Sequence, residues 1–263
     1  MKRISLLLLV IGVCFLAACG QEDTNEAAST TDEKVIKVGA VPDGFPVSYK
    51  EDDDLKGFSV DIIKEIAKEA GYEVEWVTSD WNGVLANLQS GKVDTAINFA
   101  ATPERAETYN FTEPYYSSKA VIATAEKNDT LNEVEDIKGK DIAAIMGTNF
   151  ENVLAEEYPD LTYELITYES NDVVYTDIAS GKIDGFIFGR EQLLAQISER
   201  ELPLRIVGDP FGDQPVALPF QKDEENDALI EELNEATVRL KENGKFSEIS
   251  LEYFDVDLLE DEK

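Results

Sequence analysis

Two stretches of the chain, "LQSGKVDTAI" at residues 88–97 and "IASGKIDGFI" at residues 178–187, repeat one pattern at a separation of 90 residues. Each begins on the apolar face of a helix, continues with a glycine where a helix ends, and finishes with apolar residues typical of a strand. The glycines are Gly91 and Gly181, and the residues expected to face the core are Val84, Leu85, Leu88, Val93 and Ile97, then Ile178, Ile183, Phe186 and Ile187. A unit of helix, glycine cap and strand that occurs twice predicts two similar α/β lobes.

Each copy also places an aspartate, Asp94 or Asp184, at the start of its strand. A carboxylate at this position can accept hydrogen bonds from nearby backbone amides. We therefore expect both aspartates to be structural and to face a turn, not a cleft.

The flanking sequence alternates strand and helix patterns, which favours mostly parallel sheets. A helix from Gly57 to Gly71 is expected to bury Val60, Ile63, Ile66 and Ala67. The other expected elements are strands at 35–41, 74–77, 141–145, 161–168 and after Gly181, helices from about Phe150 and Asp172, and a helical tail at 226–254. In that tail Leu229, Leu233, Ala236, Val238 and Leu240 are expected to face inward, and a short turn ending at Tyr253 and Phe254 to follow Gly244.

The N-terminus has the pattern of an export signal. Lys2 and Arg3 precede the apolar residues 4–13, and "LAA" leads into Cys19. The apolar run is too short to span a membrane. The "LAAC" sequence resembles a lipobox, which predicts a lipoprotein signal peptide at 1–18 and a lipid on Cys19; the alternative is an ordinary signal peptide.

Composition narrows the class of protein further. Residues 19–33 contain no large apolar side chain, so they are expected to form a flexible tether. The net charge of −32 makes nucleic acid an unsuitable partner. The two cysteines, Cys14 and Cys19, leave the folded part without a thiol, which excludes disulfide and thiolate chemistry there.

Six motifs in order carry a resemblance to a known family. They are "GFSVDI" at 57–62, Trp81 with the first "SGKVD", "TPERAETYNFTEPYY" at 102–116, "DIKGKDIAAIMGT" at 136–148, the second "SGKID", and "ENGKFSEISLEYF" at 242–254. Over residues 35–254 the chain resembles the family-3 extracellular solute-binding proteins, the polar amino-acid receptors of ABC importers.

This resemblance implies an α/β, periplasmic-binding-protein-like fold, with two lobes joined by a two-strand hinge and a ligand cleft between them. Lobe 1 would comprise residues 34–123 and 215–263, lobe 2 residues 124–214, and the hinge would cross near 121–125 and 212–218. The ligand would stabilise the closed form, which a permease would recognise.

The resemblance also implies a function. The chain would be a monomeric binding protein without a cofactor or metal, and not an enzyme. It would lie outside the cytoplasm, held to the cell membrane by lipidated Cys19. Its ligand would be a polar amino acid, a class that includes cystine-like compounds, or a related small carboxylate.

Several positions match the family's ligand site. Arg105 stands at the place of the carboxylate-binding arginine, where a planar guanidinium suits a carboxylate; the alternative is a surface ion pair with Glu104 or Glu107. Thr148 and Asn149 match positions that add a hydroxyl and backbone amides, or else they cap a helix.

The remaining candidates form the walls of the cleft. Trp81 and one of Phe45 or Tyr49 would sandwich the ligand or fill the core. Asn98 and Ala100 would line the cleft, with alanine where a hydroxyl is common in the family.

Gly189 departs from the family pattern. Members typically carry an aspartate there that pairs with the ligand's α-ammonium group, and a buried cation without a partner is costly. Either another acceptor, such as Glu191, Asp213 or Asp172, replaces it, or the ligand lacks a free α-amine.

The fold is also compatible with functions other than a transport receptor. A sensor domain or a small-carboxylate dehydratase-like enzyme can share this fold. The chain has no histidine and no cysteine in its folded part, which removes common catalytic groups and leaves carboxylates. A calcium loop at "EDDDLKG" is rejected, because Lys56 and Ile63 stand where oxygen ligands are needed; the run is expected to be a solvated hairpin tip.

Overall fold

The computed structural model describes residues 34–254 and 257–259. These residues belong to one compact unit, Glu33–Lys263. The expected signal peptide, the tether, Cys14 and Cys19 lie outside the described residues.

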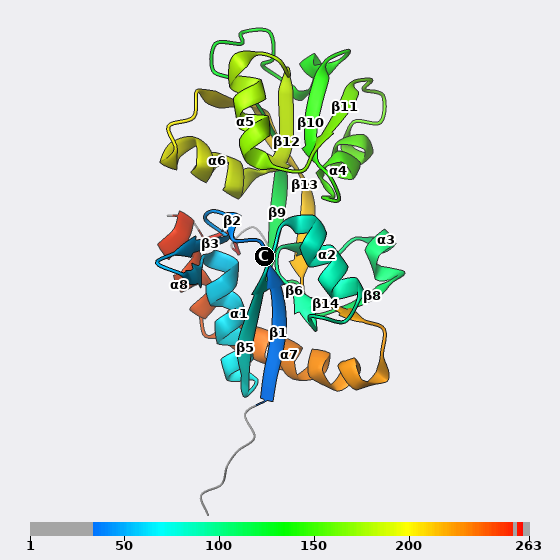
Figure 1. Ribbon diagram of the computed structural model, residues 1–263, viewed down its shortest axis with the longest axis vertical. Helices are drawn as coiled ribbons and strands as arrows, with labels where there is room; N and C mark the ends of the chain where they lie inside the picture. Colours follow the sequence, from blue (N-terminus) through cyan, green and yellow to red (C-terminus); the bar gives the residue numbers. More distant parts are fainter. Residues whose placement is uncertain (1–33, 255–256, 260–263) are drawn as a thin grey trace, which may run out of the picture. The chain divides into compact units, whose positions relative to one another are not determined.

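The helices and strands follow the expected alternation along most of the chain (Figure 1). The strands are β1 (Lys34–Ala40), β2 (Asp43–Gly44), β3 (Ser48–Glu51), β4 (Asp54–Lys56), β5 (Tyr72–Thr78), β6 (Thr95–Ala96), β7 (Phe99–Ala100), β8 (Tyr109–Phe111), β9 (Tyr116–Ala125), β10 (Asp141–Ile145), β11 (Glu164–Tyr168), β12 (Gly185–Gly189), β13 (Leu204–Ala217) and β14 (Pro219–Gln221). The helices are α1 (Phe58–Glu69), α2 (Trp81–Gln89), α3 (Pro103–Ala106), α4 (Phe150–Glu157), α5 (Asn171–Ser180), α6 (Arg190–Glu199), α7 (Glu224–Glu242) and α8 (Lys245–Phe254), with a short 3-10 helix, η1 (Val134–Ile137).

The repeated sequence forms the same cap twice. Helices α2 and α5 are followed by Gly91 and Gly181, whose φ angles are +70° and +81°. The next amide in each copy donates back to a carbonyl in the last turn of its helix, over 2.9 Å in both cases. A left-handed residue at this place favours glycine, so the prediction of two glycine caps is confirmed.

The two aspartates of the repeat tie each unit to its neighbouring strand. Asp94 Oδ2 accepts a hydrogen bond from the backbone N–H of Lys37 in β1 at 2.7 Å. Asp184 Oδ2 accepts one from the N–H of Asp141 in β10 at 3.0 Å. The expected structural role of both aspartates is therefore confirmed, and it is the same in both copies.

Two sheets form the bodies of the lobes. Strands β5, β1 and β6 are parallel throughout. The larger sheet has the order β11-β10-β12-β9-β13-β7, in which β10 is parallel to β11 and β12 while β9 and β13 run antiparallel to their neighbours. The prediction of mostly parallel sheets is thus wrong for the larger sheet, because β9 and β13 are long crossing strands and not parts of a strand-helix-strand unit.

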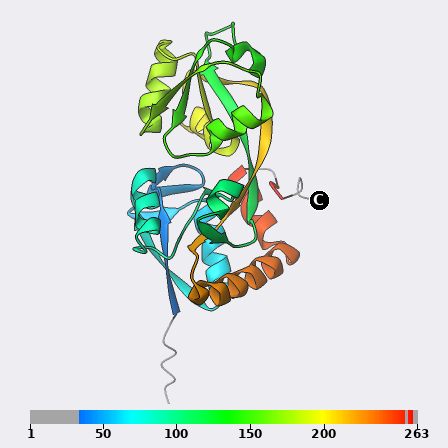
Figure 2. The ribbon, with the colours of Figure 1, turned by 90° about the vertical axis from the view of Figure 1, so that its right-hand side faces the viewer.

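Buried apolar side chains divide into clusters on either side of the crossing strands. The clusters of lobe 1 contain residues 36–116 and 216–258, and the clusters of lobe 2 contain residues 120–211. Figures 1 and 2 show the two groups of elements with β9 and β13 running from one to the other. The lobe boundaries at 123/124 and 214/215 stay a prediction, because both strands pass through them without a break.

Some local expectations were wrong. Residues 245–254 form the helix α8 and not a short turn, since Phe246 and Ile249 lie one turn apart and pack into the core of lobe 1. Val238 is 48% exposed, because it lies on the outer face of α7. Strand β6 covers two residues and leaves Val93 and Ile97 buried beside it.

The acidic run at 51–57 was predicted correctly. Strands β3 and β4 pair with Glu51 opposite Asp54, so Asp52 and Asp53 form the exposed tip of a hairpin.

We expect Gly212→Ala to destabilise the protein. Gly212 in β13 has a φ of +63°, and an added Cβ would lie 2.2 Å from Val153 Cγ1. The left-handed backbone costs about 1–2 kcal/mol for alanine, and the forced contact adds about 1–3 kcal/mol. Urea unfolding measures the sum.

The matched control is Gly139→Ala, at a φ of +70° with no other atom within 4 Å of the added Cβ. It should show the backbone cost alone. Equal losses of stability in the two variants would contradict the packing argument for Gly212.

Candidate ligand-binding site

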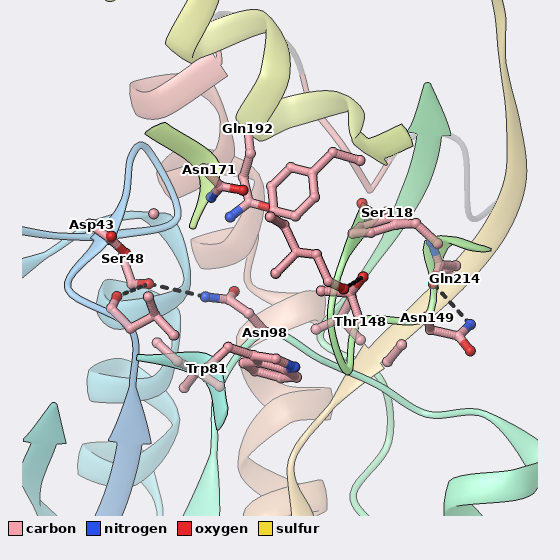
Figure 3. A pocket seen from close by; sticks show the side chains of 18 of the residues that line it. Asp43, Ser48, Trp81, Asn98, Ser118, Thr148, Asn149, Asn171, Gln192 and Gln214 are labelled. Carbon is pink, nitrogen blue, oxygen red and sulfur yellow. Dashed lines mark hydrogen bonds between the residues drawn. The ribbon is translucent and has the colours of Figure 1, made fainter. Parts of the chain in front are cut away.

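A pocket of about 430 Å³ lies between the lobes and has a size typical of small-molecule sites. It draws residues from both lobes and from the crossing strands (Figure 3). Its lining residues are Val41, Asp43, Gly44, Ser48, Asp80, Trp81, Ile97, Asn98, Ala100, Arg105, Tyr116, Ser118, Ile145, Thr148, Asn149, Phe150, Glu169, Ser170, Asn171, Phe188, Gln192, Gln214 and Val216.

Arg105 is the only basic residue among the described residues that line this pocket. It is positioned by the short helix α3, which starts with Pro103 and in which Thr102 Oγ1 accepts the Arg105 N–H at 3.2 Å. Its guanidinium lies 4.3 Å from the centre of the Phe99 ring and donates to the carbonyls of Ala100 and Gly147 at 3.1 and 3.0 Å. Burial lowers the pKa of Arg105.

No described acidic residue forms an ion pair with Arg105, so the predicted alternative of a surface pair with Glu104 or Glu107 does not occur in the described part of the chain. A desolvated cation held only by neutral carbonyls is a group that an anionic ligand would stabilise.

The Gly147 carbonyl connects the lobes through two donors of lobe 1. The indole Nε1 of Trp81 donates to it at 3.0 Å, and Arg105 Nη2 donates to it at the same distance. Trp81 is placed by the N-cap of α2, where Asp80 Oδ1 accepts the Gly83 N–H at 2.7 Å. Trp81 therefore contributes both a wall of the pocket and a contact between the lobes.

Thr148 and Asn149 line the pocket at the start of α4. Neither makes a side-chain cap of that helix: Thr148 Oγ1 donates to the Ile145 carbonyl at 2.8 Å, and Asn149 Nδ2 donates to Gln214 Oε1 at 3.2 Å. Asn149 thus stands at the N-cap position that the alternative predicted, but it does not cap the helix with its side chain. Gln214 lies in β13, and its buried Nε2 has no partner among the described residues.

Asn98 and Ala100 line the lobe 1 side of the pocket. Asn98 has a left-handed backbone, with a φ of +58°, which asparagine tolerates better than most residues. Its Oδ1 accepts from Ser59 Oγ at 2.5 Å and its Nδ2 donates to Ser48 Oγ at 3.2 Å, so its amide is held rigidly.

Phe45 and Tyr49 do not line the pocket. Their rings pack edge to face, with centroids 4.9 Å apart. Their neighbours Gly44 and Ser48 face the pocket instead, so the aromatic wall expected from Phe45 or Tyr49 is absent from the described lining. Other aromatic rings, from Tyr116, Phe150 and Phe188, join Trp81 there.

Gly189 is not itself in the lining, but it faces lining residues. A Cβ added to Gly189 would lie 3.1 Å from Phe150 Cζ, 3.2 Å from Gln192 Oε1 and 3.6 Å from Ser118 Oγ. The space next to the missing side chain is thus occupied by the carboxamide of Gln192.

The three acidic residues considered as replacement acceptors do not line the pocket. Buried Glu191 accepts from Ser118 Oγ at 2.9 Å and pairs with Arg190 at 2.8 Å. Asp213 and Asp172 pair with Lys119 and Arg200 and are exposed.

Sequence reasoning missed several lining residues, in particular Asp43, Ser118, Asn171, Gln192 and Gln214. They come from five separate elements, the strands β2, β9 and β13 and the helices α5 and α6, and only the fold brings them together. The position of Gln192 three residues after Gly189 was a signal that could have been used, since residues three apart lie on one helical face.

Three carboxylates line the pocket: Asp43, Asp80 and Glu169. Asp80 is engaged in the α2 cap, and Glu169 is exposed. Asp43 keeps more than a third of its surface open, yet the protein packed around its carboxylate raises its pKa above the ordinary value of 3.8, with smaller contributions from Asp172 and Asp80.

Within the described residues, no group of three or more histidine, cysteine, aspartate or glutamate side chains is arranged to hold a metal ion. In the same part of the chain no helix combines the length and apolar character that crossing a membrane requires.

The class of the protein follows from its similarity to known proteins. The profile of the bacterial extracellular solute-binding proteins, family 3, matches residues 36–256, and the chain belongs to this family. The resemblance noted from the motifs is therefore confirmed, and so is the fold of two α/β lobes joined by two strands with a cleft between them.

The relatives of this chain include the probable amino-acid-binding protein YxeM of Bacillus subtilis, 35% identical over 100% of this chain and 99% of YxeM. The putative amino-acid ABC transporter-binding protein PatH of Vibrio harveyi is 34% identical over 88% of this chain and 93% of PatH.

Solved structures show the same fold. An ancestral arginine-binding protein bound to arginine has a TM-score of 0.76 at 27% identity and covers 84% of this chain and 99% of its own. An ancestral amino-acid-binding protein, described as a precursor of cyclohexadienyl dehydratase, has a TM-score of 0.72 at 25% identity, over 84% of this chain and 95% of its own. The relatives are thus named as binding proteins, and one structural neighbour is a binding protein described as the precursor of an enzyme.

We expect Asp43→Asn to raise the melting temperature at pH 7. The raised pKa means that ionising Asp43 is less favourable in the folded than in the unfolded chain, so its contribution lowers stability as the pH rises above 3.8. The gain should be small, because the side chain is partly solvated, and it should shrink as the pH approaches 3.8.

Asp160→Asn, at an exposed turn outside the pocket, controls for the relief of general repulsion in a chain of net charge −32. A gain for Asp43→Asn no larger than for this control, or one that does not change with pH, would contradict the prediction.

Proposed function

We propose that the chain is the lipid-anchored substrate-binding component of an ABC importer and that it binds a small carboxylate, an amino acid or a derivative of one, in the pocket between its lobes. The family, and relatives that are amino-acid-binding proteins, support the general role. The ligand, the lipid anchor, the permease, the monomeric state and the part of each residue in binding are proposals.

The observation that carries the proposal is Arg105. Its guanidinium is partly buried, stacks on Phe99 and makes hydrogen bonds to backbone carbonyls without a carboxylate partner in the described part of the chain. An arginine in this state provides a planar set of donors that matches a ligand carboxylate. Trp81, Asn98, Thr148 and Asn149 would surround the rest of the ligand.

Closure provides the signal for a permease. The lobes are linked at the Gly147 carbonyl, and a ligand that contacts both sides of the pocket stabilises the closed form by its differential affinity for that form. A non-enzymatic role agrees with the relatives named as binding proteins. None of the described lining residues is a histidine or a cysteine.

The location is part of the proposal. The family is extracellular. Attachment through lipidated Cys19, after removal of residues 1–18, would keep the protein at the outer face of the cell membrane and next to its permease, with residues 19–33 as the tether.

We expect Arg105→Ala to weaken binding of a carboxylate ligand by on the order of 100-fold or more, because charge-assisted hydrogen bonds to a buried group are lost. The ligand is first found by a thermal-shift screen of amino acids and their derivatives, and titration calorimetry then gives the dissociation constants. Arg105→Lys should also weaken binding, since lysine keeps the charge without the planar donors.

Arg239→Ala is the control, because Arg239 is exposed and pairs with Glu69 far from the pocket lining. Unchanged affinity in Arg105→Ala would remove the central support of the proposal. A large drop in the melting temperature without ligand would show that Arg105 is structural.

We expect Cys19→Ser to release the protein from the membrane fraction into the soluble fraction of the expressing cells, because the residue that accepts the lipid is gone. Fractionation followed by immunoblotting measures this, with Cys14→Ser as the control that should stay attached. Continued attachment of Cys19→Ser would contradict the lipoprotein proposal.

A further inference from the structure

The carboxamide of Gln192 lies between two glycines that come from different lobes. An added Cβ on Gly189 would lie 3.2 Å from Gln192 Oε1, and an added Cβ on Gly44 would lie 3.3 Å from Gln192 Nε2. Gly44 belongs to β2 in lobe 1, whereas Gly189 ends β12 in lobe 2. The absence of both side chains lets one glutamine reach across this end of the pocket.

Gln192 is available to a ligand. It lines the pocket, is partly buried, and forms no hydrogen bond with any other described residue. Figure 3 shows its amide next to that of Asn171, across the pocket from Trp81. Asn171 Oδ1 is fully buried and also lacks a partner among the described residues.

The carboxylates of the pocket are either engaged or at least partly open to water. Asp80 caps α2, Glu169 is exposed, and Asp43 lies beside Ser48 on the lobe 1 side (Figure 3). Buried Glu191 is bound by Arg190 and Ser118. A ligand ammonium group placed next to Gln192 would be desolvated among neutral carboxamides, and the carboxylate next to this end of the pocket is Asp43, the neighbour of Gly44, which is more than a third exposed. A partly solvated partner offsets only part of the cost of that desolvation.

A neutral amide group of the ligand suits this end of the pocket better than an ammonium group. A carboxamide such as Gln192 offers one acceptor and two donors, and an ammonium group can satisfy the acceptor alone. The N–H and the carbonyl of a trans amide point in opposite directions, so they bind two different side chains. The ligand N–H could donate to Asn171 Oδ1 while its carbonyl accepted from Gln192 Nε2. Both kinds of unpaired atom would then be satisfied.

We propose that Gln192, with Asn171, forms a subsite for an uncharged amide group, so that the ligand is an amino acid whose α-amine is acylated and whose carboxylate binds at Arg105. This inference rests on the proposed function, because it assumes a carboxylate ligand in the pocket. Gln192 would then be the residue that determines specificity for a neutral ligand group over a cationic one.

The test uses the full-length chain in mild detergent and two matched panels, the free amino acids and their N-acetyl derivatives. Thermal shift identifies the compounds that bind, and calorimetry gives their dissociation constants. Wild-type protein should bind at least one N-acetyl compound at least tenfold more tightly than its free partner. Gln192→Glu should weaken binding of that N-acetyl compound at least tenfold. It should also reduce or reverse the preference for the N-acetyl compound over the free amino acid, because a carboxylate of the same size favours the ammonium group.

Gln89→Glu is the matched control, since it adds the same charge on an exposed part of α2 outside the pocket. Gln192→Met keeps the length of the side chain without its hydrogen bonds. This variant should weaken binding of the N-acetyl compound at least tenfold, while its melting temperature without ligand stays that of the wild-type protein. The test therefore does not depend on the folding of Gln192→Glu.

The two proposals fail in different ways. Free amino acids that bind wild-type protein as tightly as their N-acetyl partners would overturn the amide subsite and leave the proposed function standing, and loss of their binding in Asp43→Asn would identify Asp43 as the acceptor instead. Unchanged preference in Gln192→Glu and Gln192→Met would also overturn it. No binding by either panel would contradict both proposals.

Discussion

Strands β9 and β13 pair with each other through both lobes, and the arrangement of the site depends on this pairing. Hydrogen-bonded register fixes which residues of the two strands lie opposite each other. Ser118 of β9 is opposite Gln214 of β13, and both line the pocket. The register shifts twice between Val207 and Asp213, close to the left-handed Gly212, so the strands bend where they pass between the lobes. The same pair of strands therefore connects the lobes and supplies the middle of the ligand site.

The sequence predicted what depends on local chemistry. The two glycine caps need only a few neighbouring residues, and they were recognised from the repeat. The structural role of Asp94 and Asp184 was also predicted, but the strands that they bond to, 57 and 43 residues away, were not. Arg105 and Trp81 were recognised from motifs, and both line the pocket. In contrast, α8 was not predicted as a separate helix, because the helical tail was expected to break at Gly244 and continue as a short turn.

The rest of the site could not be predicted because it depends on how distant segments meet. Phe45 and Tyr49 were natural choices by residue type, but the direction of a loop decides that Gly44 and Ser48 face the pocket. The side chain of Gln192 has room in the pocket because Gly44 and Gly189 lack side chains. These glycines are far apart in sequence, and no periodic sequence pattern predicts that they meet. Gln214 and Ser118 are adjacent only through the pairing of β9 with β13. Residue types alone are a poor guide where tertiary contacts select which side chains face a cavity.

The division of the buried clusters along the chain has a consequence for the order of folding. The clusters of lobe 2 draw on one continuous stretch, residues 120–211, whereas those of lobe 1 need residues 36–116 together with 216–258. Contacts between distant segments form slowly, because the intervening chain must be closed into a loop first. We expect the inserted lobe to become compact before the discontinuous one, with α7 and α8 docking last. The cleft would then take shape at the final step, so a protein truncated before α7 would keep a folded half and lose the pocket.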